Sequence, residues 1–221
     1  MKIKVVANVL EANEARAVEN RRLLDQNGVL CVNMMSAPGS GKTTLLQKTL
    51  AALDAGGTPS AVLVGDLQTS RDAERLADGK AQIVQINTGQ GCHLTSSQVT
   101  HGLRELDLSG LAFLFIENVG NMVCPASFDL GEHAKVVLLS TAEGNDKIAK
   151  YPVLFQQADV ILLTKVDLAG VLEYDKSRVY EDLKHINTRA PVIELSAKTG
   201  QGVNQWLTWL KERRQSLKDR S

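Results

Sequence analysis

The sequence has 221 residues, which is enough for one α/β domain with a sizeable core and a short extension. Lysine plus arginine equals aspartate plus glutamate at 25 each, so the formal net charge of zero argues against a dominant nucleic-acid or anionic-membrane role. The apolar runs are too short to span a bilayer, the N-terminus lacks a signal-peptide pattern, and three cysteines do not make a disulfide scaffold. We therefore expect a cytoplasmic protein with reduced thiols, no nucleic-acid partner and no membrane partner.

Strand-like and helical segments alternate along the chain. The first is an amphipathic helix over 12–26, which stops at an Asn-Gly pair. Apolar runs predict strands at 29–35, 61–65, 82–86, 111–117, 134–140, 160–164 and 192–195. Helices are expected at 43–55, 95–105, 148–157, 175–187 and 203–217. The alternation predicts an α/β fold with a mostly parallel sheet and helices on both faces, formed by a main domain (29–221) behind an N-terminal helical arm (1–28).

The first expected strand leads into a glycine-rich loop and then a helix. Residues 36–43 read SAPGSGKT, the phosphate-loop pattern GxxxxGK[ST], with a serine at the first glycine that weakens the match because serine tolerates a positive φ poorly. Gly39 and Gly41 let backbone N–H groups curl toward phosphate oxygens at the positive end of the helix. Lys42 reaches the outer phosphates, and the Thr43 hydroxyl is placed for Mg²⁺. The nucleotide-binding residues expected in this P-loop NTPase motif are Pro38, Gly39, Ser40, Gly41, Lys42, Thr43 and Thr44.

Two later segments indicate which base the nucleotide carries. Residues 164–167 read TKVD, and the Asp167 carboxylate can accept two hydrogen bonds from guanine N–H groups that adenine does not offer as a pair. The stem of Lys165 can lie along the base, and residues 196–198 (SAK) can offer a backbone N–H to the guanine carbonyl. Both segments follow expected strands, at the edge where open α/β sheets bind ligands, so GTP is the predicted nucleotide. The expected base-site residues are Thr164, Lys165, Asp167, Ser196, Ala197 and Lys198.

Two acidic residues stand at the ends of expected strands. Asp66 follows the run 61–65, and Glu117 begins Glu-Asn-Val-Gly, where many GTPases have the aspartate of DxxG. We expect Asp66 and Glu117 to hold Mg²⁺ or its waters and to act with Lys42 in GTP hydrolysis, while the Gly120 amide senses the γ-phosphate. A solvated loop carboxylate is the other interpretation of each acid. Because no glutamine stands at an obvious water-positioning site, intrinsic hydrolysis to GDP is expected to be slow.

Two cysteines and a histidine fall on loops at the same end of the expected sheet. They are Cys92, His93 and Cys124, and two thiolates with an imidazole suit Zn²⁺ or Ni²⁺ while leaving a coordination position open. The spacing is not a standard zinc pattern, so spacing alone favours ordinary reduced cysteines beside a surface histidine. Cys31 lies within the first strand and is expected in the core.

Together these segments resemble the HypB family of hydrogenase nickel-incorporation GTPases, of the SIMIBI class. The motifs that carry the resemblance are SAPGSGKTTLL at 36–46, GCHL at 91–94, ENVGNMVCP at 117–125 and EGNDKIAKYP at 143–152. The resemblance implies that Cys92, His93 and Cys124 hold Zn²⁺ or Ni²⁺. It also implies a GTP-dependent homodimer in which Lys147 approaches a nucleotide across the interface. Delivery of nickel to the hydrogenase large subunit, with a HypA-like nickel chaperone, is the implied function.

Three alternatives stay open. A UreG-like protein would carry a Cys-Pro-His motif, whereas Ala126 follows Cys124-Pro125 here. A G-protein chaperone for another metalloenzyme, such as a cobalamin-dependent mutase, is the second, and a regulatory GTP-binding module without a functional metal is the third. Some family members also carry an N-terminal cysteine motif or a histidine-rich tract. The sequence has neither, so we expect no nickel-storage role.

Overall fold

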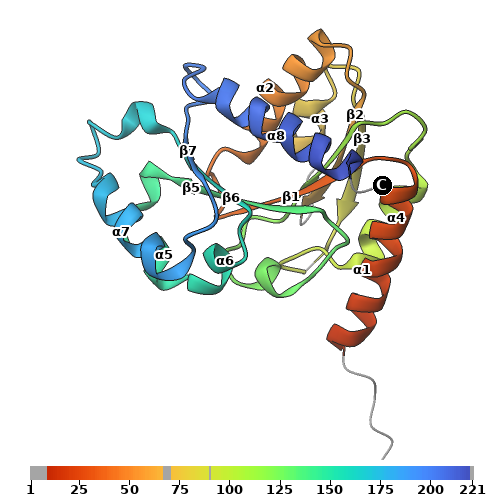
Figure 1. The fold of residues 1–221 in the computed structure, drawn as a ribbon, viewed down its shortest axis with the longest axis horizontal. Coiled ribbons are helices and arrows are strands. Elements are labelled where there is room, and N and C mark those ends of the chain that lie inside the picture. Colours follow the sequence, from red (N-terminus) through yellow and green to blue (C-terminus); the bar gives the residue numbers. More distant parts are fainter. Residues whose placement is uncertain (1–8, 67–70, 90, 220–221) are drawn as a thin grey trace, which may run out of the picture.

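Seven parallel strands form one sheet with helices on both faces, in a computed structural model that describes residues 9–66, 71–89 and 91–219 (Figure 1). The strand order is β3-β2-β4-β1-β5-β6-β7, and each neighbouring pair is parallel. The strands are β1 (Leu30–Ser36), β2 (Ser60–Asp66), β3 (Gln82–Asn87), β4 (Phe113–Glu117), β5 (Ala134–Ser140), β6 (Val160–Thr164) and β7 (Val192–Glu194). The α/β fold with a sheet covered on both faces, as predicted from the alternation of elements, is confirmed.

The helices are separated by short loops at the two ends of the sheet. They are α1 (Val9–Gln26), α2 (Lys42–Ala55), α3 (Arg71–Leu76), α4 (Ser96–Arg104), α5 (Lys147–Lys150), α6 (Pro152–Gln156), α7 (Lys176–Ile186) and α8 (Val203–Lys218). Three short 3₁₀ turns add η1 (Cys124–Ser127), η2 (Thr141–Glu143) and η3 (Val166–Leu168). In Figure 1, α2, α3 and α8 lie above the sheet, and α1, α4, α5, α6 and α7 lie below it.

Alternate residues of each strand face opposite layers, which accounts for the two covered faces. In β1, Val32 and Met34 pack with α2 and α8, whereas Cys31 packs with α1 and α4. All three side chains are buried, which confirms the prediction that Cys31 is a core residue. The carboxyl ends of the strands therefore remain the part of the sheet that the loops can turn into a binding site.

Trp206 fixes α8 on α2. Its ring is fully buried, and its Nε1 donates a hydrogen bond of 2.9 Å to Thr49 Oγ1. We expect Trp206→Ala to lower the free energy of unfolding by about 3–5 kcal/mol, because it leaves a large cavity in the core and removes the hydrogen bond to Thr49. Urea denaturation measures the change, and the half-buried neighbour Trp209, replaced by alanine, is the control with a smaller loss. A loss below about 1 kcal/mol for Trp206→Ala would contradict this packing.

The helix α1 is anchored to the sheet layer by buried amides. The Ser96 backbone N donates to Asn13 Oδ1 at 2.9 Å, and Asn20 Nδ2 donates to the carbonyls of Ser96 and Leu130. The helix therefore packs on the first turn of α4. The first eight residues of the predicted arm lie outside the described part, and the division of the chain at residue 28 stays a prediction.

The helices of the structure differ from the predicted ones at two places. The single helix expected at 148–157 is wrong, because the chain forms α5 and α6 with a break at Tyr151. Pro152 has no backbone N–H to continue a helix and instead begins α6. The short helix α3 was not predicted, since six residues are too few to show a helical period.

Candidate nucleotide and metal site

The phosphate loop encloses a cavity of about 430 Å³ at the carboxyl end of the sheet. Gly39 and Gly41 adopt φ of 75° and 98°, and an added Cβ would meet no atom within 4 Å at either. The left-handed backbone, rather than crowding, therefore explains why glycine occupies both positions. The strain expected at Ser36 is absent, because the left-handed residues other than glycine in the described chain are Lys165 and Glu173. Ser36 is an ordinary strand residue that ends β1.

Lys42, Thr43 and Glu117 form a buried polar cluster beneath the phosphate loop. Lys42 Nζ donates to Ser36 Oγ at 2.8 Å, and Thr43 Oγ1 donates to Glu117 Oε1 at 2.6 Å. Burial raises the pKa of Glu117 to about 6, against the opposing effects of the Thr43 hydrogen bond and the Lys42 charge. Burial also lowers the pKa of Lys42. Lys42 is thus held close to the loop by a neutral hydroxyl, from which it can turn to a phosphate.

Glu117 also carries the feature that best fits a divalent cation. It is 3% exposed, and its Oε2 has no hydrogen-bond partner within the described residues. An orphaned carboxylate oxygen beside a hydroxyl, at the wall of a cavity, is a suitable donor set for Mg²⁺. Asp66, at the end of β2, lines the same cavity. The residues present therefore fit the predicted ion.

Several further residues line this cavity. Gly120 lies so close to Pro38 that an added Cβ would be 2.9 Å from Pro38 Cα. Asp72 and Arg75 of α3 were not predicted, although their spacing of three residues is typical of a helical ion pair. Arg75 Nη2 donates to Thr44 Oγ1 at 3.2 Å, so α3 contacts the start of α2. The phosphate site is therefore larger than its sequence motif.

A second cavity of about 260 Å³ adjoins the first. It is lined by Thr164, Lys165, Asp167, Ser196, Ala197 and Lys198, together with residues of the phosphate loop. Thr164 Oγ1 donates to the Ser40 carbonyl at 2.7 Å, and Lys165 Nζ donates to the Gly39 carbonyl at 2.7 Å. Lys165 lines both cavities and has φ of 57°. The structure thus brings the two predicted base-site segments together beside the phosphate loop.

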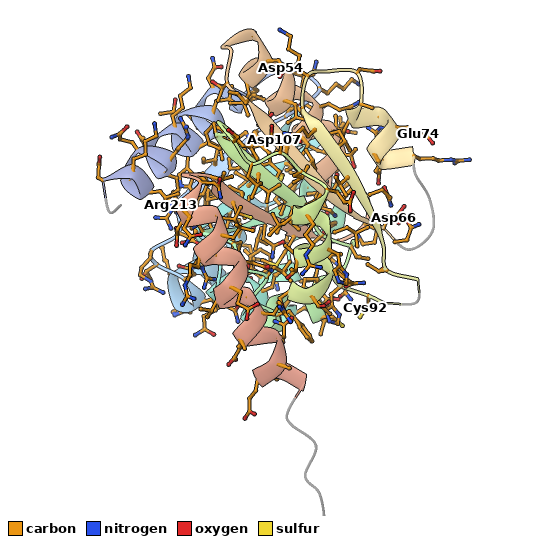
Figure 2. The ribbon with its side chains drawn as sticks, turned by 90° about the vertical axis from the view of Figure 1, so that its right-hand side faces the viewer. Asp54, Asp66, Glu74, Cys92, Asp107 and Arg213 are labelled. Carbon is orange, nitrogen blue, oxygen red and sulfur yellow. The ribbon has the colours of Figure 1, made fainter. Side chains whose placement is uncertain are left out.

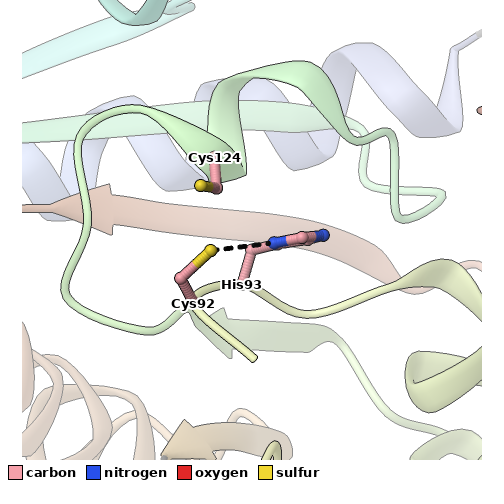
Figure 3. Close-up of side chains that lie close together, drawn as sticks. All are labelled: Cys92, His93 and Cys124. Atoms are coloured by element: carbon pink, nitrogen blue, oxygen red, sulfur yellow. Dashed lines mark hydrogen bonds between the residues drawn. The ribbon is translucent and has the colours of Figure 1, made fainter. Parts of the chain in front are cut away.

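The two cysteines and the histidine converge on the loops after β3 and β4, beside the phosphate cavity that Asn118 and Gly120 line. One ligand atom from each of Cys92, His93 and Cys124 lies within 4.8 Å of the others (Figure 3). Cys92 Sγ is 3.5 Å from His93 Nδ1. A hydrogen bond with Cys124 raises the pKa of Cys92, while burial lowers the pKa of His93. A divalent metal would displace the thiol protons and bind the neutral imidazole, so the chemistry of these donors fits Ni²⁺ or Zn²⁺.

Both metal-site loops are held in place by their neighbours. The His93 ring packs on Phe128 with centroids 3.9 Å apart, and Asn121 Nδ2 donates to the Cys92 carbonyl at 3.2 Å. Thr88 connects this loop to β2, because its N donates to the Asp66 carbonyl at 2.9 Å. Figure 2 shows Cys92 and Asp66 on the same side of the molecule. The candidate metal site therefore adjoins the cavity that fits a nucleotide.

Comparison with known proteins identifies the family to which this chain belongs. Residues 30–194 match the family model "CobW/HypB/UreG, nucleotide-binding domain". The hydrogenase maturation factors HypB of Azotobacter vinelandii and Escherichia coli K12 are 43% and 44% identical over 212 residues, covering 96% of this chain and 70% and 73% of theirs. The crystal structure of HypB from Helicobacter pylori in complex with nickel is 38% identical with a TM-score of 0.88, covering 93% of this chain and 96% of that one. The chain belongs to the HypB family.

One residue that was expected to bind the nucleotide lies apart from both cavities. Lys147 is half-buried at the start of α5 and is not among the residues that line either cavity. A role across a subunit interface therefore stays a prediction. Among residues 9–66, 71–89 and 91–219, no helix has the length and apolar content to cross a membrane.

Proposed function

We propose that this HypB-family chain is a GTP-hydrolysing metallochaperone that binds nickel and assists its insertion into the [NiFe]-hydrogenase large subunit. The observation that carries the proposal is the Cys92–His93–Cys124 cluster beside a phosphate cavity. The relatives named above are hydrogenase maturation factors, and the Helicobacter pylori protein was crystallised with nickel.

In this proposal the two cavities receive one GTP molecule. The phosphates lie against the glycine-loop N–H groups, and Lys42 turns from Ser36 to the β- and γ-phosphates. Thr43, Glu117 and Asp66 would hold Mg²⁺ or its waters, and the ion, when bound, would neutralise charge on the phosphates. Asp167 accepts hydrogen bonds from guanine in the second cavity.

Nickel is the cargo rather than a resident cofactor. Cys92, His93 and Cys124 supply three ligands, which leaves room for a water or for a ligand from the receiving protein. Zn²⁺ suits the same donors. A HypA-like nickel chaperone and the hydrogenase large subunit are the proposed partners. GTP favours a homodimer in which Lys147 approaches the partner subunit's nucleotide.

Intrinsic GTP hydrolysis is expected to be slow. Single-turnover hydrolysis by the isolated protein should proceed below about 1 s⁻¹, because none of the described residues that line the phosphate cavity is a glutamine able to orient the attacking water. Rapid mixing of the protein with radiolabelled GTP and Mg²⁺ measures the rate. A rate above this value would show that a residue not proposed here positions the water.

The maturation role is tested by genetic complementation with the double variant Cys92→Ser/Cys124→Ser. Wild type should restore hydrogenase activity to a strain lacking its own HypB, and the double variant should not. If the variant restores activity, the chain acts as a regulatory GTP-binding module instead. If wild type fails to restore it in that strain, the hydrogenase assignment is wrong and a different client, such as a mutase, becomes the candidate.

A further inference from the structure

The loop that follows β4 carries Cys124. It contacts the phosphate loop on one side and, on the other, the segment of residues 88–95 that carries Cys92 and His93, which we call the metal loop. Glu117 accepts a hydrogen bond from Thr43, and Gly120 packs on Pro38. Three residues farther along, the backbone N of Val123 donates to Asn121 Oδ1 just before Cys124. Any movement of this loop on phosphate binding therefore reaches residues beside the metal ligands.

Asn118 is the buried side chain of this loop that contacts the metal loop. It is 2% exposed and lines the phosphate cavity. Its Oδ1 accepts hydrogen bonds from the backbone N of Val119 at 3.0 Å and of Leu94 at 3.2 Å. Leu94 directly follows His93. The Asn118 amide oxygen therefore connects the loop after β4 to the metal loop, which carries two of the three metal ligands.

The orientation of the Asn118 amide is fixed by the groups around it. Backbone N–H groups only donate, so Oδ1 must face Leu94 and Val119, and Nδ2 must face the opposite way. There it donates to Asn33 Oδ1 at 3.2 Å, in β1. Asn33 Nδ2 in turn donates to Glu132 Oε1 at 3.2 Å, and the Leu130 N donates to Glu132 Oε2 at 2.7 Å; this end of the network is also buried.

This network crosses the sheet from the β4 loop through β1 to the segment before β5. Asn118 donates to Asn33, and Asn33 donates to the Glu132 carboxylate, which only accepts. A fully paired buried network holds a side chain in one position, because each break leaves a polar group unpaired in the interior. The network therefore fixes the orientation of the Asn118 amide, so a displacement of the loop backbone is passed on to Leu94 and is not absorbed by rotation of the side chain.

We propose that Asn118 is a positioning residue that makes nickel affinity depend on the bound nucleotide. The inference rests on the proposed function, since it requires nickel at the cysteine-histidine cluster and GTP in the phosphate cavity. When a γ-phosphate draws the Glu117–Gly120 loop toward the phosphate loop, Asn118 Oδ1 moves with it. The hydrogen bond to Leu94 then shifts His93 relative to Cys124.

The test compares nickel dissociation constants with GDP and with a non-hydrolysable GTP analogue. In wild type the two constants are expected to differ by at least about fivefold. Asn118→Ala and the similarly sized Asn118→Leu each remove the oxygen that accepts from Leu94 and the amide group that donates to Asn33. Both variants should still bind nickel, because the three ligands are unchanged, but the ratio of their two constants should fall to within about twofold of one.

Asn187→Ala is the matched control. Asn187 is also buried, donates to the carbonyls of Phe155 and Ala158, and accepts from two backbone N–H groups after α7. It lines neither cavity, so its loss should lower stability while the wild-type ratio is kept. Isothermal titration calorimetry gives the constants, and Asn118→Leu decides the matter if Asn118→Ala does not fold.

A wild-type ratio retained in the Asn118 variants would overturn the inference. Equal nickel affinity of wild type with GDP and with the GTP analogue would also overturn the inference. In that case nickel binding together with GTP hydrolysis would still support the proposed function. If wild type bound no nickel at this cluster, both the inference and the metallochaperone proposal would fail.

Discussion

GTP is expected to lose about 100-fold or more in affinity when Asp167 is replaced by asparagine. Asp167 lies in the second cavity beside Lys165, where its carboxylate can accept from the ring N–H and exocyclic amino group of guanine. The asparagine amide keeps one acceptor oxygen, but its NH₂ group faces a second N–H donor of guanine, so one of the two hydrogen bonds is lost. Xanthosine triphosphate carries a carbonyl in place of the amino group, so the variant should bind it better than GTP.

Competition between fluorescent GDP and unlabelled nucleotides measures this reversal. Asp175→Asn is the control, because Asp175 caps α7 at an exposed position and lines neither cavity. Its GTP affinity should match wild type. Unchanged GTP affinity in Asp167→Asn would show that guanine is recognised elsewhere.

The second large effect concerns the metal. Replacing Cys92 and Cys124 by serine should weaken nickel binding by more than about 100-fold, because a serine hydroxyl stays protonated near neutral pH and is a poor ligand for a borderline metal. Competition with a chromophoric chelator measures the affinity.

Cys31→Ala is the control for this double variant. Cys31 is buried in β1 on the face covered by α1 and α4, away from the cluster, so its removal should cost stability without changing nickel affinity. Wild-type affinity in Cys92→Ser/Cys124→Ser would rule out the cluster as the nickel site.

The nucleotide motifs were predictable because each is a contiguous run whose chemistry is local. The glycine loop and the Thr164–Asp167 segment follow apolar strands, and a parallel sheet brings the carboxyl ends of its strands to one edge. Asp72 and Arg75 were missed because α3 is a single short helix with no clear period. Pro152 broke a helix that apolar spacing alone had extended.

The metal cluster and its link to the nucleotide depend on contacts that no spacing encodes. His93 and Cys124 follow different strands, and their approach requires β4 to lie beside β2 and the two loops to fold over the same edge. The Asn118–Asn33 hydrogen bond likewise needs β1 beside β4. Only the family resemblance, and not the sequence pattern itself, assigned the three residues to a metal.

The central claim is that one chain binds nickel at a cysteine-histidine cluster and that the guanine nucleotide controls that binding. Nickel titration of wild type by calorimetry, with no nucleotide, with GDP and with a non-hydrolysable GTP analogue, tests it most directly. We expect one nickel per protomer and dissociation constants that differ by at least about fivefold between GDP and the analogue. Equal constants in the two nucleotide states, or no nickel binding in any of the three, would contradict the account.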